Sequence, residues 1–249
     1  MTERRTVLSF VIPAHNEEPN VGATVASVQR AGRALGVPFE VVVVDDASTD
    51  ETAAVARAAG ARVVPASVRQ IARSRNAGAA AAEGEHLIFV DADTVVTDEV
   101  VRAAHATLLA GAVGGGSAVR FDDPIPRYGR LFLWLGMPAS RLAKVAFGCF
   151  VYCRRDAFEA IGGFDTELFA GEEIEFSRAL KRLRRGPFVC LREAVITSGR
   201  KLRTYSAWQL LTALFRLFVL GRRGVRRREG LELWYGPRKP DPGQSQQPS

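Results

Sequence analysis

The sequence has little cysteine and little histidine, which argues against a fold held together by disulfides and against a zinc site. Of its 249 residues, three are cysteine and three are histidine. The cysteines are odd in number and contain no Cys-x-x-Cys pair, which speaks against a disulfide framework and indicates buried free thiols in a reducing cytoplasm. The histidines are widely scattered, so the sequence gives no support to a zinc site built from His and Cys.

Long hydrophobic runs are also missing. The N-terminus leads from Met1-Thr2-Glu3-Arg4-Arg5 directly into a strand-like run and lacks the apolar region of a secretory signal peptide. A helix expected over residues 205–220 has an apolar part of about sixteen residues and carries Arg216, whereas a span of the bilayer needs about 20 residues. We therefore expect a cytoplasmic protein.

Acidic residues are scarce only near the C-terminus. Residues 200–249 hold eleven Lys or Arg and three acids, a net charge of +8 against +7 for the whole chain, which leaves −1 for the rest. The basic excess thus belongs to an appendage on a nearly neutral body. No recognised nucleic-acid-binding module accompanies it, so nucleic acid is not an expected partner.

The first hundred residues alternate apolar, β-branched runs with stretches of helical spacing, in a composition typical of globular proteins. Strands are expected over 7–12, 39–44, 62–64 and 87–90, with helices over 21–35, 50–59 and 68–82. The alternation predicts an α/β fold with a mostly parallel sheet, wound by right-handed crossovers and flanked by helices.

The second half is less regular. Further strands are expected over 112–121, 147–152 and 195–197, helices over 155–161, from Glu172 and over 205–220, and a mobile or helical connection over 124–138. Residues 237–249, with four prolines and a run of Gln and Ser, are expected to be a disordered tail.

Two carboxylates, Asp91 and Asp93, follow the fourth expected strand directly. A strand end places them at the carboxyl edge of the sheet, where open α/β sheets bind ligands. A hard divalent ion shared with a phosphate-bearing substrate fits between such carboxylates. By itself, however, the motif is more typical of a surface turn that caps the next helix.

Three polar clusters together favour a binding site over the alternative that these residues only cap the following helices. Each one follows an expected strand: Pro13-Ala14-His15-Asn16-Glu17-Glu18, Asp45-Asp46-Ala47-Ser48-Thr49-Asp50 and Asp91-Ala92-Asp93. Because parallel strands end at the same edge of a sheet, one crevice is expected to collect all three clusters.

These segments resemble the inverting family-2 glycosyltransferases of the GT-A fold. The resemblance covers about residues 6–200 and also includes Arg73 and Asn76, Gly-Gly-Phe-Asp at 162–165 and Gly-Glu-Glu at 171–173. It implies transfer of a sugar from a nucleoside-diphosphate sugar to a saccharide or lipid-linked acceptor, with inversion. It also implies a nucleotide-binding half over about 6–95 and an acceptor half over about 96–203, which together form a GT-A domain over 1–203.

The resemblance assigns a role to most of the strand-end residues. It places Pro13, Ala14, His15 and Glu17 at the nucleoside, Asp46 at the base, Asp45 in the loop or at the ribose, Arg73 and Asn76 beside the nucleotide, Asp91 near the ribose and sugar, and Asp93 on Mg²⁺ or Mn²⁺. The divalent ion would neutralise charge on the diphosphate leaving group as a Lewis acid. Without the resemblance, Arg73 and Asn76 are better interpreted as a helix-surface ion pair and a cap.

A general base for the acceptor hydroxyl is expected at the start of the helix near residue 172. The family usually has Glu-Asp there with the Asp as base, and in this sequence Glu173 stands in that place, one methylene longer. Glu172 and Glu175 remain alternatives. Acids in a first helical turn are also favoured by the helix dipole alone.

The Gln-x-x-Arg-Trp motif of the family's processive polymerases is missing from this sequence. Arg200 and Lys201 lie in the corresponding region, where they fit either a clamp on the leaving pyrophosphate or a basic, membrane-facing loop. We therefore expect single addition rather than polymerisation.

The region 204–236 has an apolar helix face followed by clustered arginines. Two interpretations remain open: an amphipathic C-terminal helix on an anionic membrane, at the inner face of the cell membrane, or a helix packed on the domain. Two alternative functions are a sugar-nucleotide pyrophosphorylase, whose Gly-rich basic loop is missing after the first strand, and an inactive membrane adaptor. Retention of Asp46, Asp93 and Glu173 argues against the adaptor.

Overall fold

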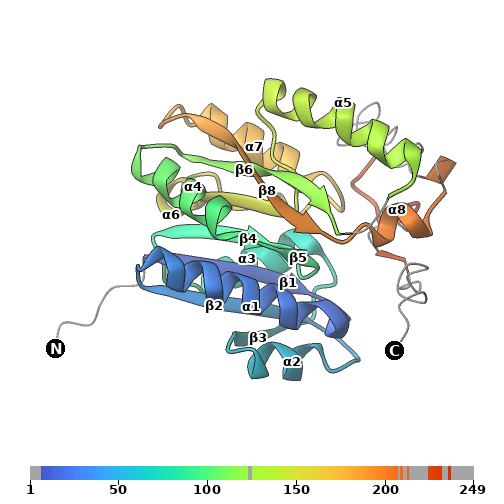
Figure 1. Ribbon diagram of the computed structural model, residues 1–249, viewed down its shortest axis with the longest axis horizontal. Coiled ribbons are helices and arrows are strands. Elements are labelled where there is room, and N and C mark those ends of the chain that lie inside the picture. The colour runs from blue at the N-terminus through green and yellow to red at the C-terminus, as the bar shows by residue number, and fades with distance from the viewer. Residues whose placement is uncertain are drawn as a thin grey trace.

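The strands expected from apolar runs all belong to one eight-stranded sheet (Figure 1). The computed structural model describes residues 7–122, 125–206, 208–209, 212, 224–231 and 235–236. Its strands are β1 (Leu8–Ala14), β2 (Phe39–Asp46), β3 (Arg62–Ala66), β4 (His86–Val90), β5 (Thr94–Val95), β6 (Gly114–Phe121), β7 (Phe150–Arg154) and β8 (Phe188–Thr197). Its helices are α1 (Glu18–Leu35), α2 (Thr52–Ala58), α3 (Ile71–Ala81), α4 (Asp98–Leu109), α5 (Arg127–Ala143), α6 (Arg155–Ala160), α7 (Glu172–Arg182) and α8 (Arg200–Thr204).

The strand order is β3-β2-β1-β4-β7-β6-β8-β5. The first four strands of the chain pair in parallel, as the sequence predicts, and so do β6 and β8. Strand β7 runs antiparallel to both of its neighbours, and β5 runs antiparallel to β8. The predicted mostly parallel α/β sheet is therefore confirmed, with an antiparallel strand between its two parallel parts.

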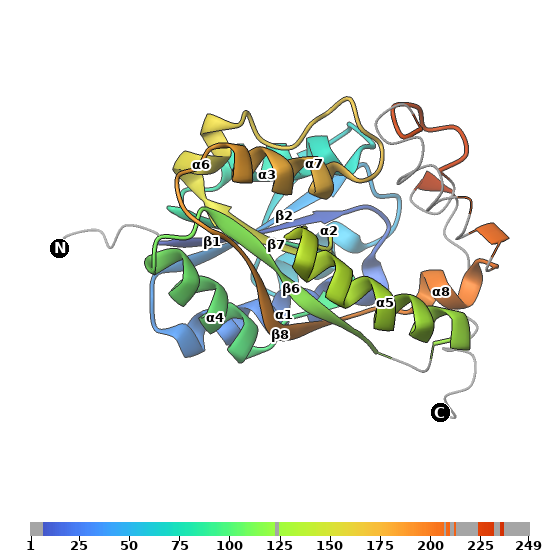
Figure 2. The same cartoon turned by 90° about the horizontal axis from the view of Figure 1, so that it is seen from above.

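Helices cover both faces of the sheet, with α1 and α4 on one side and α3, α6 and α7 on the other (Figure 2). On the first side, Val21, Val25 and Val28 of α1 are fully buried in the core. On the second side, Phe89 of β4 packs against the rings of Phe164 and Phe176, at 4.9 and 6.4 Å between ring centroids. Strands buried on both faces explain the near-continuous apolar runs of β1, β2 and β4.

Helix α3 lies unusually close to the sheet. A Cβ at Gly78 would stand 2.3 Å from Cγ1 of Val11 and 2.8 Å from Cγ2 of Val44, so only glycine fits there. The close approach matters for function, because α3 begins at the carboxyl edge of the sheet and carries Ser74 and Arg75 toward it.

Several elements differ from the expectation. Helix α4 was not expected, although Thr97 caps it by accepting a hydrogen bond from the Val100 amide at 3.3 Å. Helix α5 continues through Pro138 to Ala143. Helix α3 begins at Ile71 rather than at residue 68, because the amides of residues 68–70 are bound by a carboxylate of β2.

The helix expected over 205–220 and the tail expected over 237–249 lie largely or wholly outside the described residues. Within the described part of the chain, no helix is both long enough and apolar enough to cross a membrane.

Candidate active site

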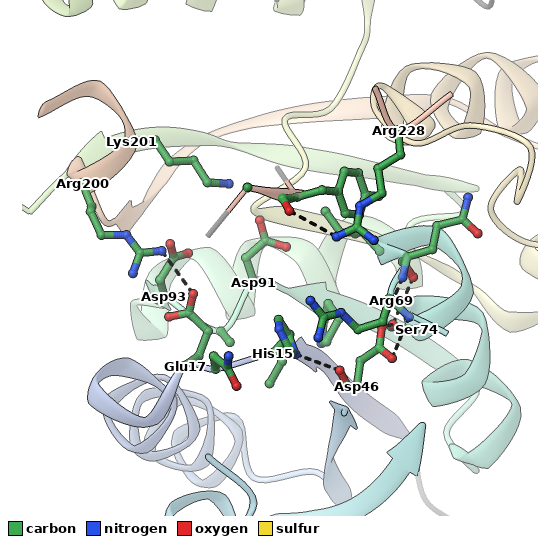
Figure 3. A pocket seen from close by; sticks show the side chains of 18 of the residues that line it. His15, Glu17, Asp46, Arg69, Ser74, Asp91, Asp93, Arg200, Lys201 and Arg228 are labelled. Atoms are coloured by element: carbon green, nitrogen blue, oxygen red, sulfur yellow. Dashed lines mark hydrogen bonds and ion pairs between the residues drawn. The ribbon is translucent and has the colours of Figure 1, made fainter. Parts of the chain in front are cut away.

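A pocket of about 310 Å³ opens at the carboxyl edge of the parallel strands (Figure 3). The loops after β1, β2 and β4 meet there, as predicted from the three polar clusters, because β1 pairs with both β2 and β4. The lining residues are Pro13, Ala14, His15, Asn16, Glu17, Asp46, Arg69, Gln70, Ile71, Ser74, Asp91, Ala92, Asp93, Arg200, Lys201, Thr204, Tyr205, Arg228, Tyr235 and Gly236.

The loops after β1 and β2 are held to each other by side-chain hydrogen bonds. The Asn16 amide donates to Ser48 Oγ at 3.0 Å, and Asn16 Oδ1 accepts from the Thr49 amide at 2.8 Å. The Glu17 amide donates to Thr52 Oγ1 at 2.8 Å. The strand-end position of Glu17 is therefore fixed before any ligand binds.

Asp46 organises the wall of the pocket opposite Glu17. One carboxylate oxygen accepts hydrogen bonds from the amides of Val68 and Arg69 at 2.7 and 2.9 Å. The other accepts from the Gln70 amide at 3.2 Å and from Ser74 Oγ at 2.7 Å. Since a carboxylate has about four lone-pair sites, a hydrogen bond from a base to Asp46 would have to replace one of these. The backbone oxygen of Asp46 contacts Nδ1 of His15 at 2.9 Å.

The carboxylates of Glu17, Asp91 and Asp93 gather at the other end of the pocket (Figure 3). Burial raises the pKa of Asp93 to about 6, and the Glu17 and Asp91 carboxylates act in the same direction, while Lys201 and Arg200 oppose the shift. Arg200 Nη2 donates to Glu17 Oε1 at 3.2 Å. Helix α8, which the sequence analysis did not expect, thus brings both predicted cations to the strand-end acids.

A buried arginine that the sequence analysis did not single out lies behind this end of the pocket. Arg75 is 2% exposed, and its Nη2 donates to Asp91 Oδ1 at 2.9 Å and to the carbonyl of Gly148 at 2.8 Å. Its Nη1 donates to Glu172 Oε1 at 2.7 Å, and its guanidinium stands 5.2 Å from the ring centroid of Phe164. Arg75 therefore joins the end of β4 to the first turn of α7.

Helical phase could have identified Arg75. Ala72, Arg75 and Ala79 follow one another at i, i+3 and i+7, and all three are buried. Arg73, the predicted residue, is exposed and does not line the pocket. Asn76 faces the turn before α7, where its side chain donates to the Phe164 carbonyl and accepts from the Phe164 amide, both at 2.9 Å. Asp45 also stays outside the lining and accepts a hydrogen bond from the Ser48 amide at 3.3 Å.

The two candidate bases differ in their surroundings. Glu172 is 4% exposed and bound to Arg75. Glu173 is partly buried, and its carboxyl carbon would be 3.5 Å from a Cβ on Gly148. Burial raises the pKa of Glu173 to about 8, the Glu172 carboxylate adds to the shift, and Arg75 opposes it. A group with a pKa near neutrality suits proton transfer. Neither glutamate lines the pocket itself.

The comparisons with known proteins agree with this arrangement. Residues 9–162 match the model of Glycosyl transferase family 2. A curated relative, the 4,4'-diaponeurosporenoate glycosyltransferase of Staphylococcus aureus (strain MRSA252), is 47% identical over 57 residues, which are 23% of this chain and only 14% of that protein.

Three solved structures share the fold. The mannosyltransferase PcManGT from Pyrobaculum calidifontis, in complex with GDP-Man and Mn²⁺, aligns at a TM-score of 0.65 and 16% identity over 88% of this chain and 64% of that one. TarS 1-349 of S. aureus aligns at 0.59 and 18%, over 86% and 66%. Glucosyl-3-phosphoglycerate synthase from Mycobacterium tuberculosis aligns at 0.59 and 21%, over 89% and 81%. These likenesses confirm the predicted GT-A type of sheet.

Proposed function

Because this chain belongs to glycosyl transferase family 2, we propose that it transfers one sugar at a time from a nucleoside-diphosphate sugar to an acceptor hydroxyl, with inversion and with the help of Mg²⁺ or Mn²⁺. The observation that carries the proposal is the meeting of three strand-end loops in one pocket, with carboxylates at one end and cations across from them. A pyrophosphorylase, the second function considered, does not agree with the family.

The pocket suits a donor with a nucleoside and a diphosphate. His15, Arg69 and Gln70 line the end of the pocket beside Asp46, which suits the nucleoside, and the carboxylates of Glu17, Asp91 and Asp93 lie at the other end. Arg200 and Lys201 face the Asp93 end, where the diphosphate would lie. Nη1 of Arg200 is buried and has no hydrogen-bond partner among the described residues, so an incoming phosphate oxygen would supply the missing acceptor.

The same end of the pocket fits a divalent cation. Asp93, Glu17 and Asp91 offer hard oxygen donors. Burial raises the pKa of Asp93, the neighbouring carboxylates of Glu17 and Asp91 add to the shift, and a bound cation would favour the charged form of Asp93 instead. Among the residues that the structure describes, no three acidic, His or Cys side chains are close enough to hold a metal alone, so the diphosphate would complete the ligand set with Asp93. When bound, the ion neutralises charge on the leaving group.

We assign the general base to Glu173. Glu172 is occupied by Arg75 at 2.7 Å and would have to give up a buried ion pair to accept a proton. Glu173 stands beside it with no ion pair of its own in the described part of the chain and with a pKa raised to about 8. In its charged form it would take the proton of the acceptor hydroxyl, and a single displacement by that hydroxyl inverts the anomeric carbon.

We extend the proposal to a saccharide or lipid-linked acceptor presented at an anionic membrane surface. The strongly basic residues 200–249 support this part of the proposal, and so does helix α5, in which Trp134 and Leu142 are 72% and 89% exposed. Residues 127–144 contain four Lys or Arg and no acid. Exposed apolar side chains among cations suit contact with anionic lipid headgroups.

A panel of nucleoside-diphosphate sugars, followed by thermal shift and by hydrolysis with and without Mn²⁺, tests the proposal. We expect one donor to raise the melting temperature in a Mn²⁺-dependent way. Asp93→Asn should abolish the metal dependence and leave the fold intact. A chain that ignored every nucleotide sugar with or without metal would contradict the proposal and favour the adaptor.

A further inference from the structure

A segment near the C-terminus, residues 224–231 with Tyr235 and Gly236, packs on the loop that leads into α7. The Phe169 amide donates to the Val225 carbonyl at 2.8 Å, and the rings of Phe169 and Tyr235 meet edge to face at 5.7 Å between centroids. Val225 and Leu231 are 3% and 1% exposed and share a small core with Leu168. Buried apolar side chains fix this segment against the domain, although the resemblance in sequence ends before it.

Two side chains of this segment face the pocket. Arg228 and Tyr235 both line it, and the Arg228 guanidinium stands 5.1 Å from the centroid of the Tyr235 ring. Nη2 of Arg228 also donates to the Tyr235 carbonyl at 3.2 Å. The ring and the carbonyl orient the guanidinium without neutralising it, because neither carries a charge.

The charge around the pocket is incompletely paired. Arg200 has Glu17 as its ion-pair partner at 3.2 Å. In the described ranges, neither Lys201 nor Arg228 has a carboxylate within ion-pair distance. Figure 3 shows that Lys201 and Arg228 extend from opposite walls toward the space beside Asp91. Two cations that face one cavity repel each other unless an anion lies between them.

We propose that Arg228 binds a phosphate oxygen of the nucleoside diphosphate, so that the basic segment at the C-terminus forms part of the donor site. The inference rests on the proposed function. A guanidinium that is held flat and orientated can offer two parallel N–H groups to a phosphate, which is the geometry that distinguishes Arg from Lys. The neighbouring arginines differ: Arg226 pairs with Glu167 outside the pocket, and Arg227 does not line it.

This contrast supplies a matched control for the experiment. Full-length Arg228→Gln and Arg227→Gln lose the same charge one residue apart. Calorimetric titration with UDP and GDP in the presence of Mn²⁺ gives the affinity for each, and uridine and guanosine give the contribution of the nucleoside alone. For the diphosphate that the unaltered protein prefers, we expect Arg228→Gln to bind about 10- to 100-fold more weakly, the range of a lost hydrogen bond to a charged group. Arg227→Gln should stay within about twofold.

Each outcome distinguishes the assignment from its alternatives. The inference is overturned if the two variants bind the nucleoside diphosphate equally well. It is also overturned if Arg228→Gln loses as much affinity for the nucleoside as for the diphosphate, because the contact would then be with the base. If Arg228→Gln melts early, Arg228→Lys keeps the charge but lacks the paired N–H groups. A lower affinity of Arg228→Lys for the diphosphate, with unchanged affinity for the nucleoside, then supports the assignment, and an unchanged diphosphate affinity contradicts it. An unaltered protein that binds neither these diphosphates nor any nucleotide sugar of the panel refutes the proposed function itself, so the two failures are separable.

Discussion

Replacement of the buried Arg75 should destabilise the protein far more than replacement of an exposed arginine that also pairs with a glutamate of α7. Arg75→Met keeps the length of the side chain but leaves Glu172, which is 4% exposed, without its partner at 2.7 Å. Removal of one member of a buried ion pair costs about 3–5 kcal/mol, because the other charge stays buried and uncompensated. For a chain of this size each kcal/mol lowers the melting temperature by about 2–4 °C, so we expect a decrease of about 6–20 °C.

Arg178→Met is the matched control. Arg178 pairs with Glu175 at 2.6 Å in the same helix, but its side chain is 56% exposed, and exposed pairs contribute about 0.2–1 kcal/mol. The double variant Arg75→Met/Glu172→Gln should recover part of the loss, since it removes the orphaned charge. Urea unfolding and thermal melting, followed by circular dichroism, give the free energies of unfolding. If Arg75→Met costs no more than Arg178→Met, the buried network does not hold β4 to α7 as described.

Three further expectations follow from the site. Burial raises the pKa of Glu173 to about 8 from 4.5, so folding penalises its charged form: the penalty is absent below pH 4.5, grows as pH rises toward 8 and is constant above. The rate of sugar transfer at limiting donor concentration should therefore rise with pH toward about 8. The Glu173→Gln variant should lose about 10²–10⁴-fold in rate and should be more stable than the parent protein at high pH. If Glu173→Gln keeps the pH–rate profile of the parent, the general base is another residue. Asp46→Ala removes four hydrogen bonds that position residues 68–70 and Ser74. Hydrogen exchange at the amides of residues 68–70 should therefore become faster, and the affinity for the donor should fall. Amides that stay protected would show that other contacts hold the loop. Sedimentation with anionic vesicles at low salt should weaken in Trp134→Ser and with added salt, and a parent protein that ignores such vesicles rules out the membrane part of the proposal.

The sequence by itself determined the local features of this protein. Apolar, β-branched runs that end in Pro13, Asp45 and Asp91 are recognisable in one dimension, because a strand buried on both faces needs such residues and a parallel sheet collects its strand ends at one edge. That reasoning was sufficient to predict the α/β class, the parallel arrangement of the first four strands and the gathering of three loops around one pocket, which the structure confirms.

The tertiary structure decided what depends on contacts between distant parts of the chain. The antiparallel direction of β7 follows from pairing with β4 and β6, about sixty and forty residues earlier, and no local pattern encodes it. Arg75, and not Arg73, contacts the pocket residue Asp91, since the position of Gly78 against Val11 sets which face of α3 is buried. The four hydrogen bonds of Asp46 come from residues 22 to 28 positions away, and Arg228 reaches the pocket only because Val225 and Leu231 pack beside Leu168. A charged side chain acquires its role from the partners that folding brings to it, and those partners are set by packing rather than by neighbours in sequence.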